Sequence, residues 1–275
     1  RRAQPRRAGG GEPLLHLHRR LIVKAMAEVC GGRCFVDGGG EHEGALIVRK
    51  LGEGGLGNVW LARDEKLNRN VAIKEMNRHA LESPHAWQRF EREAEIAGQL
   101  EHPNVVSLYQ YGTDQKTGEP FYSMRFVGKR TLADAITEYH DRCLAGNCDP
   151  LILHRLLTAF LGVCQAIAYA HSRGVIHRDL KPENILLVDR SERPRLKITD
   201  FGVARYAMRL SRSRPGVVRG KYDYMSPEQL LGNQIDSRSD IFSLGTLLYE
   251  MASGQNPFRG STDYQTMERV VAAAP

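Results

Sequence analysis

This 275-residue chain contains the segment His177-Arg178-Asp179-Leu180-Lys181-Pro182-Glu183-Asn184, and Asp200-Phe201-Gly202 follows sixteen residues after Asn184. The fold is most clearly indicated by these two segments. The two segments gather carboxylate, amide, imidazole and basic side chains in one short region. A lone Asp or His is more often a structural residue than a catalytic one. Chance agreement of both segments, in this order and at this spacing, is negligible, so we expect the chemistry of the protein to lie here.

A glycine-rich motif lies far upstream, at Gly52-Glu53-Gly54-Gly55-Leu56-Gly57. The pattern G-x-G-x-x-G is weak alone, because it also opens dinucleotide-binding folds, where the glycines precede a helix. Here the next residues, 58–62, have the β-branched and apolar pattern of a strand. The motif therefore predicts a glycine hairpin whose amides can approach ATP phosphates closely at Gly52, Gly54 and Gly57. An ordinary turn is the alternative.

Lys74 ends the apolar run Val71-Ala72-Ile73-Lys74, where an ammonium group needs an anionic partner. A helix expected downstream carries Glu91, Glu93 and Glu95. Because these alternate positions point in different directions around a helix, at most one of them easily faces the lysine. A Lys74–Glu93 pair would orient the lysine toward the α- and β-phosphates of a nucleotide, and the other two glutamates remain alternatives.

The composition and residue pattern of the chain change twice along its length. Residues 1–45 are basic and Gly-rich, with a partly helical pattern, and we expect them to form an N-terminal appendage. Residues 46–127 are expected to form a small antiparallel sheet interrupted by one helix at about 85–100. Residues 128–275 are mainly helical in pattern, which predicts a second, larger lobe.

Composition excludes several classes of protein. The net charge is +7, yet no zinc finger, RNA-recognition signature or basic helix with interleaved aromatics is present, so no nucleic-acid partner is expected. No apolar run reaches the roughly 18 residues of a membrane span, and the longest, 160–170, fits a buried helix. We therefore expect a soluble, cytoplasmic domain.

The five cysteines are an odd number, which is typical of a reducing compartment rather than of a disulfide scaffold. The pairs Cys30/Cys34 and Cys143/Cys148 have spacings of four and five, not the two-residue gap of a zinc knuckle. We therefore expect free thiols, with a zinc site as the minor alternative.

The ordered motifs, completed by Ser226-Pro227-Glu228, resemble the protein kinase superfamily and particularly the bacterial Hanks-type serine/threonine kinases. The resemblance covers about residues 46–275. It implies an α+β, bilobal kinase fold and transfer of the γ-phosphoryl group of ATP, with Mg²⁺, to Ser or Thr hydroxyls of protein substrates. The Lys-Pro-Glu-Asn continuation favours Ser/Thr over Tyr. The resemblance also favours Glu93 as the partner of Lys74.

The resemblance also implies roles for individual residues. Asp179 would accept the substrate hydroxyl proton, Lys181 would steady the γ-phosphate, and Asn184 and Asp200 would hold Mg²⁺. Asp240 would lie on the helix that anchors the catalytic loop. The adenine site would be formed by apolar residues and a hinge segment, although the apolar residues could equally belong to a core; they are Val59, Ala72, Leu186, the gatekeeper Met124, and the hinge residues Phe126 and Val127.

Several features depart from the family pattern. Lys221 stands where a threonine is usual, which favours a pseudokinase as the first alternative, with a small-molecule phosphotransferase as the second. The basic segment 205–221 suggests the hypothesis that phosphorylation of Ser211 or Ser213 orders the loop through Arg178, with self-association for trans-autophosphorylation as the route. The alternatives are a solvated basic loop and selection of acidic substrates.

The end of the chain is a further departure. The sequence stops at Pro275, before the last helices and the arginine that usually pairs with the glutamate at position 228. We therefore expect Glu228 to lack a partner and the chain to be marginally stable.

Overall fold

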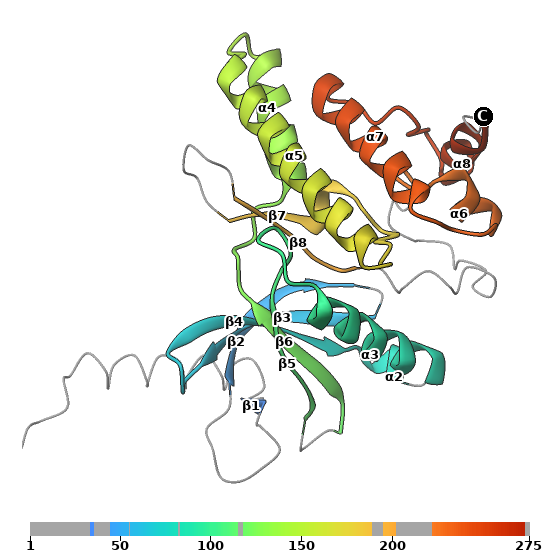
Figure 1. Ribbon diagram of the computed structural model, residues 1–275. Helices are drawn as coiled ribbons and strands as arrows, with labels where there is room; N and C mark the ends of the chain where they lie inside the picture. Colours follow the sequence, from blue (N-terminus) through green and yellow to red (C-terminus); the bar gives the residue numbers. More distant parts are fainter. Residues whose placement is uncertain are drawn as a thin grey trace, which may run out of the picture.

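The molecule has two parts, a sheet with helices beside it and a mainly helical part, and the short strands of a second sheet lie between them (Figure 1). The structure, a computed structural model, describes residues 34–35, 45–54, 56–81, 83–114, 118–188, 195–201 and 222–272. The α+β, bilobal fold expected from the motifs is confirmed.

The smaller lobe is an antiparallel sheet of order β1-β2-β3-β4-β6-β5. Two residues of the predicted appendage form the edge strand β1, which pairs with β2. The residue pattern of 105–111 predicts a strand, but β5 begins only at Leu108, and Val105 instead bridges to Ile198 of the other lobe. The elements are β1 Cys34–Phe35, β2 Ala45–Glu53, β3 Gly57–Asp64, β4 Arg69–Met76, α2 Arg78–Leu81, α3 Pro84–Gln99, β5 Leu108–Thr113 and β6 Pro120–Arg125.

Strand β4 is buried on both faces, and this fixes the position of the predicted lysine. Val71 and Ile73 pack in one cluster, and Met76 packs on the other side with Phe90 and Ala94 of α3. Helix α3 buries the residues at spacings of four and three that face the sheet, as its 3.6-residue period requires. Lys74 therefore points toward α3.

The larger lobe contains α4 Leu132–Leu144, α5 Pro150–Ser172, the 3₁₀ turn η1 Pro182–Asn184, β7 Ile185–Leu187, β8 Leu196–Ile198, α6 Pro227–Leu231, α7 Arg238–Ser253 and α8 Asp263–Ala272. Thr131, with an acidic residue three positions on at Asp134, predicts a capping box, and the structure confirms it, since the two residues exchange hydrogen bonds. The apolar pattern of 151–173 predicts a long helix that ends at Gly174; this helix is α5, and Gly174 follows it with φ of 72°.

Helix α5 is the one helix, within the described residues, that is long and apolar enough to cross a membrane by length and composition. The expectation that no segment meets this length was therefore too strict. Several of its side chains, among them Val163 and Ile167, lie in the main core of the larger lobe. This is the packing that the sequence predicted for 160–170.

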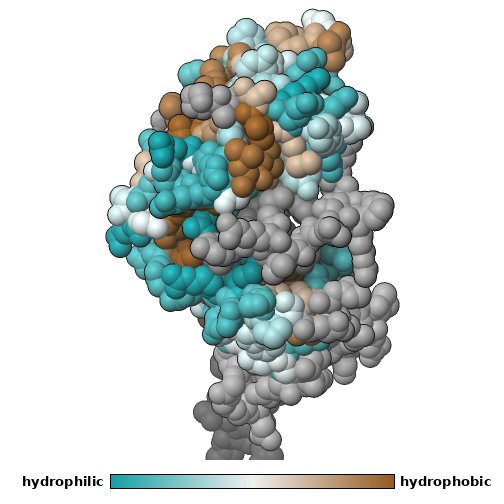
Figure 2. Space-filling view, turned by 90° about the vertical axis from the view of Figure 1, so that its right-hand side faces the viewer, coloured by the Kyte–Doolittle hydropathy of each residue, from teal (hydrophilic) through white to brown (hydrophobic). Residues whose placement is uncertain are grey.

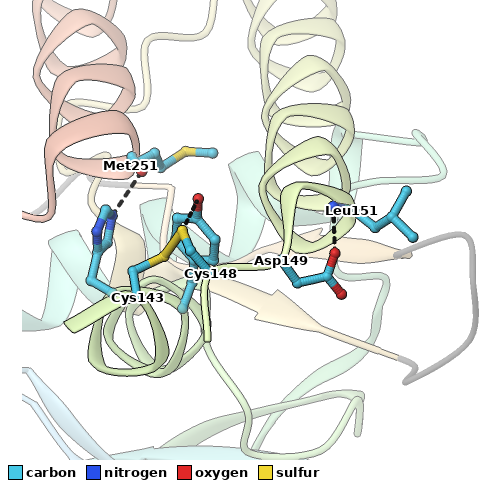
Figure 3. The surroundings of a disulfide bond; sticks show 7 residues. Cys143, Cys148, Asp149, Leu151 and Met251 are labelled. Atoms are coloured by element: carbon cyan, nitrogen blue, oxygen red, sulfur yellow. Dashed lines mark hydrogen bonds between the residues drawn. A yellow bond between two sulfur atoms is a disulfide. The ribbon is translucent and has the colours of Figure 1, made fainter. Parts of the chain in front are cut away.

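The prediction of free thiols is wrong for one pair, because Cys143, in the last turn of α4, forms a disulfide with Cys148, which follows the helix (Figure 3). The chain turns back on itself there: the amide of Asn147 donates to the carbonyl of Arg142, and Gly146 has φ of 79°. Because this turn brings the two Cα atoms to 4.0 Å, the spacing of five is no obstacle to the bond.

Helices α6, α7 and α8 lie together at one side of the larger lobe (Figure 1). Viewed from that side, the coloured surface alternates between hydrophilic and hydrophobic areas (Figure 2). Large apolar side chains exposed on α6 and α7 include Leu231 and Ile241.

Candidate active site

A buried lysine joins the two lobes. The Nζ atom of Lys74 lies 2.5 Å from Oε1 of Glu93 and 2.6 Å from Oδ1 of Asp200. Lys74 and Glu93 are 7% and 3% exposed, whereas Glu91 and Glu95 are exposed. The structure therefore selects Glu93 among the three candidate glutamates and brings Asp200, from the segment after β8, to the same ammonium group.

Tyr122 completes this cluster, and sequence reasoning missed it. Its hydroxyl donates to Oε1 of Glu93 at 2.7 Å. Burial, followed by the charge of Glu93, raises the pKa of Tyr122 well above its ordinary value, so the hydroxyl stays a donor. The signal was available in principle, because Tyr122 and the predicted gatekeeper Met124 are two residues apart on a strand and so share a face.

Charge is unevenly distributed in the cluster. Burial opposes the charged form of Lys74, but Asp200 and Glu93 together raise its pKa well above the ordinary value. Burial also opposes ionisation of Asp200, yet Lys74 lowers its pKa overall, whereas burial raises the pKa of Glu93 despite the same lysine. The Asp200 side chain is 41% exposed, so an ionised carboxylate remains accessible to a ligand beside a fixed cation.

The catalytic-loop residues lie together as predicted. Nδ2 of Asn184 donates to the backbone carbonyl of Asp179 at 2.7 Å and to its Oδ2 at 3.2 Å. Nζ of Lys181 lies 3.5 Å from the same Oδ2. The amide of Thr199 donates to the carbonyl of Asn184, which places Asp200 next to this loop.

Asp240 of α7 anchors the catalytic loop, as expected. Its Oδ2 and Oδ1 accept hydrogen bonds at 2.8 Å from the amides of His177 and Arg178, respectively. His171, a partner that the sequence did not reveal, lies 2.7 Å from the same Oδ2. A carboxylate that is 1% exposed is thus fully hydrogen-bonded, which holds the backbone before Asp179 in place.

Two residues of the site have left-handed backbone conformations, Arg178 with φ of 67° and Asp200 with φ of 55°. Such conformations cost about 1–3 kcal/mol in a non-glycine residue and persist only where the surroundings hold them. Here the surroundings are the Asp240 hydrogen bonds and the Lys74 ion pair. The strain therefore lies at the residue before Asp179 and at the expected metal ligand Asp200.

The oxygen donors present fit Mg²⁺. The side-chain nitrogen of Asn184 donates to the carbonyl of Asp179, so the side-chain oxygen of Asn184 is oriented away from that bond. Asp200 supplies a carboxylate whose pKa is lowered, so it is ionised. Two oxygen ligands from protein, completed by phosphate oxygens and water, are the usual protein contribution to a Mg²⁺ site. Within the described residues no cluster of three or more His, Cys, Asp or Glu side chains forms an all-protein metal cage.

The glycine hairpin is built as expected where it is described, which excludes Gly55. The amide of Gly54 donates to the carbonyl of Gly57 at 2.8 Å, and Gly52 has open space around it. A Cβ atom on Gly57 would lie 2.1 Å from the carbonyl oxygen of Glu75. Glycine is therefore required at position 57 so that β3 and β4 can approach one another.

The predicted adenine residues share one face of the sheet. In the β3–β4 register Val59 is opposite Lys74, and in the β4–β6 register Ala72 is opposite Met124. Because side chains alternate along a strand, these four lie on the same side. Leu186 of β7 forms a bridge with Thr131, four residues after Val127, the buried residue of the predicted hinge that also contains Phe126.

One prediction near the site is wrong and others lie outside the described residues. Glu228 is not without a partner, because the Ser239 hydroxyl donates to its carboxylate. Burial opposes ionisation of Glu228, but this hydrogen bond and others lower its pKa overall. The predictions on Gly202, Ser211, Ser213 and Lys221 fall outside the described part of the chain.

Known proteins match this chain over most of its length. The protein kinase domain model matches residues 46–274. The serine/threonine-protein kinase Pkn1 of Myxococcus xanthus is 34% identical over 92% of the chain and 33% of its own length. PknB of Mycobacterium leprae is 37% identical over 77% of the chain and 33% of its own. A probable serine/threonine-protein kinase of Streptomyces coelicolor is 35% identical over 82% and 32%. The chain thus spans about a third of these relatives.

Proposed function

Because the chain belongs to the protein kinase family, we propose that it transfers the γ-phosphoryl group of ATP to Ser or Thr hydroxyls of protein substrates. The observation that carries this proposal is that Nζ of Lys74 contacts the carboxylates of Glu93, at 2.5 Å, and Asp200, at 2.6 Å. These groups lie beside the loop in which Asn184 is hydrogen-bonded to Asp179. Lys74 and Asp200 come from different lobes and are 126 residues apart in the sequence. The relatives named as serine/threonine kinases support the choice of hydroxyl.

The mechanism follows from what each side chain can do. Lys74, held by Glu93, presents its ammonium group to the α- and β-phosphates and orients them. Mg²⁺, when bound by Asn184 and Asp200, neutralises charge on the phosphates. Phosphoryl transfer needs little covalent chemistry from the protein, so positioning and electrostatics account for most of the rate.

Asp179 acts on the acceptor. Its carboxylate is fixed by Asn184 at 3.2 Å and lies 3.5 Å from the ammonium group of Lys181. From this position it accepts the proton of the attacking hydroxyl while Lys181 steadies the γ-phosphate. The residue that acts on the acceptor hydroxyl and the residue that contacts the γ-phosphate thus lie close together on one loop.

Labelled ATP tests the proposal directly. The purified chain is incubated with Mg²⁺, γ-labelled ATP and a generic acceptor protein, and transfer to the acceptor and to the chain itself is scored. Asp179→Asn should abolish transfer while ATP binding persists, and Asp141→Asn, which changes an exposed carboxylate of α4, should have no effect. Binding of ATP by the unaltered chain without transfer would support the pseudokinase alternative, and transfer only to small molecules the phosphotransferase.

We further propose that the domain acts in the cytoplasm and phosphorylates itself through transient self-association. In a reducing cytoplasm Cys143 and Cys148 would be separate thiols. Alkylation before lysis, followed by mass spectrometry, therefore tests the location. A rate of autophosphorylation per molecule that rises with protein concentration would support reaction between two copies.

A further inference from the structure

The segment 222–229 lies directly beside the catalytic loop. Nε2 of Gln229 donates to the carbonyl of Arg178 at 2.7 Å, one residue before Asp179. Burial, followed by the charge of Glu250 and, more weakly, that of Glu183 in the catalytic loop, raises the pKa of Tyr224. The segment is therefore packed against the loop that carries Asp179, and its residues Asp223 and Tyr224 are buried.

The linker between α7 and α8, residues 254–262, holds Asp223 at two points. Nε of Arg259 lies 2.5 Å from Oδ2 of Asp223, and Nδ2 of Asn256 donates to the Asp223 carbonyl at 3.3 Å. The carbonyl of Arg259 accepts in turn from the guanidinium of Arg269 on α8, at 2.8 Å. The Asp223 side chain is 2% exposed, whereas that of Arg259 is 47% exposed.

Helix α7 holds the next residue, Tyr224. Its carbonyl accepts from the Ser243 hydroxyl at 2.7 Å, and its own hydroxyl donates to Glu250. One guanidinium nitrogen of Arg259 lies 3.9 Å from that same Glu250. Arg259 is thus the cation that faces both acidic groups of this part of the lobe, Asp223 at close range and Glu250 at longer range.

We propose that Arg259 is a positioning residue for the protein substrate, which rests on the proposed kinase function. A buried carboxylate is costly unless it is paired, so without Arg259 the Asp223 side chain would turn toward water and carry the adjoining backbone with it. The displaced backbone belongs to the same segment as Gln229, which is hydrogen-bonded to Arg178, the residue before Asp179. The nucleotide groups Lys74 and Glu93 are in the other lobe, so ATP binding should not change.

Steady-state kinetics separate this role from a general loss of stability. Arg259→Gln should raise KM for the protein acceptor about tenfold and leave KM for ATP within about twofold. Arg259→Lys keeps a cation and should recover most of the effect. Arg238→Gln is the matched control, because Arg238 also pairs with an aspartate at 2.7 Å but is 85% exposed. Equal rises in both KM values, or none, would overturn the proposal.

A second variant and a second measurement cover the remaining outcomes. The double variant Asp223→Asn, Arg259→Gln leaves no unpaired charge at position 223. It should therefore bind the acceptor better than Arg259→Gln alone. The double variant can be measured even if the single variant folds poorly. If the unaltered chain transfers no phosphate, hydrogen exchange still tests whether Arg259 positions segment 222–229. The amide of Met225, which donates to the Tyr222 carbonyl, should exchange faster in Arg259→Gln, and unchanged exchange would refute the positioning role.

Discussion

Replacing Glu93 with glutamine tests the buried cluster that joins the lobes. The change keeps the shape of the side chain and one acceptor oxygen but removes the charge that faces Lys74 at 2.5 Å and Tyr122 at 2.7 Å. Breaking a buried ion pair costs about 3–5 kcal/mol when it leaves a charge without compensation. Here Lys74 keeps Asp200 at 2.6 Å, so we expect the smaller cost of a hydrogen bond to a charged group, about 2 kcal/mol.

This loss has a thermal and a kinetic consequence. A domain of this size loses roughly 2–4 °C in Tm per kcal/mol, so the midpoint should fall by about 4–8 °C. Without Glu93 the lysine is attracted to Asp200 alone and no longer points steadily at the phosphates. We therefore expect kcat/KM to fall about 10²–10³-fold, the effect of losing one preorganised electrostatic contact.

Differential scanning calorimetry and steady-state kinetics at varied ATP measure the two effects. Glu91→Gln is the matched control, because Glu91 lies on the same helix and is exposed. Tyr122→Phe removes only the hydroxyl bond to Glu93 and should cost about 1.5 kcal/mol with less than a tenfold loss of kcat/KM. A Glu93→Gln protein with unchanged Tm and kcat/KM within about threefold of the original would refute the reasoning.

Three further perturbations have defined outcomes. Gly57→Ala should lower Tm and weaken ATP binding, measured by calorimetry, because its Cβ would overlap a strand carbonyl. Reduction, or the Cys143→Ser, Cys148→Ser variant, should lower stability by about 2 kcal/mol through the entropy of a six-residue loop, and a thermal scan with and without reductant measures this. The lowered pKa of Glu228 stabilises the fold above its unfolded value of about 4.3, and this stability is lost as pH falls through the folded pKa. Ser239→Ala should therefore lower Tm at pH 7 and flatten its decline between about pH 5 and 3.

The order and spacing of short motifs were sufficient to predict the bilobal fold and the candidate site residues. Asp179, Lys181 and Asn184 lie within six residues, so one loop conformation determines their relative positions and the sequence carries that information locally. The hairpin before β3 and the capping box before α4 were predictable for the same reason. Each depends on the conformational preference of a few neighbouring residues.

Contacts between distant segments were decided only by the tertiary structure. The sequence gives three alternate glutamates on α3, but only the packing of that helix on the sheet directs Glu93 to Lys74. The disulfide, the Ser239–Glu228 hydrogen bond and the Arg259–Asp223 pair likewise depend on how backbone segments meet in space. Sequence by itself determined which chemical groups this protein has and their local geometry, whereas the partner of each buried charge was set by long-range packing, because a pairing at a few ångströms leaves no periodic trace along the chain.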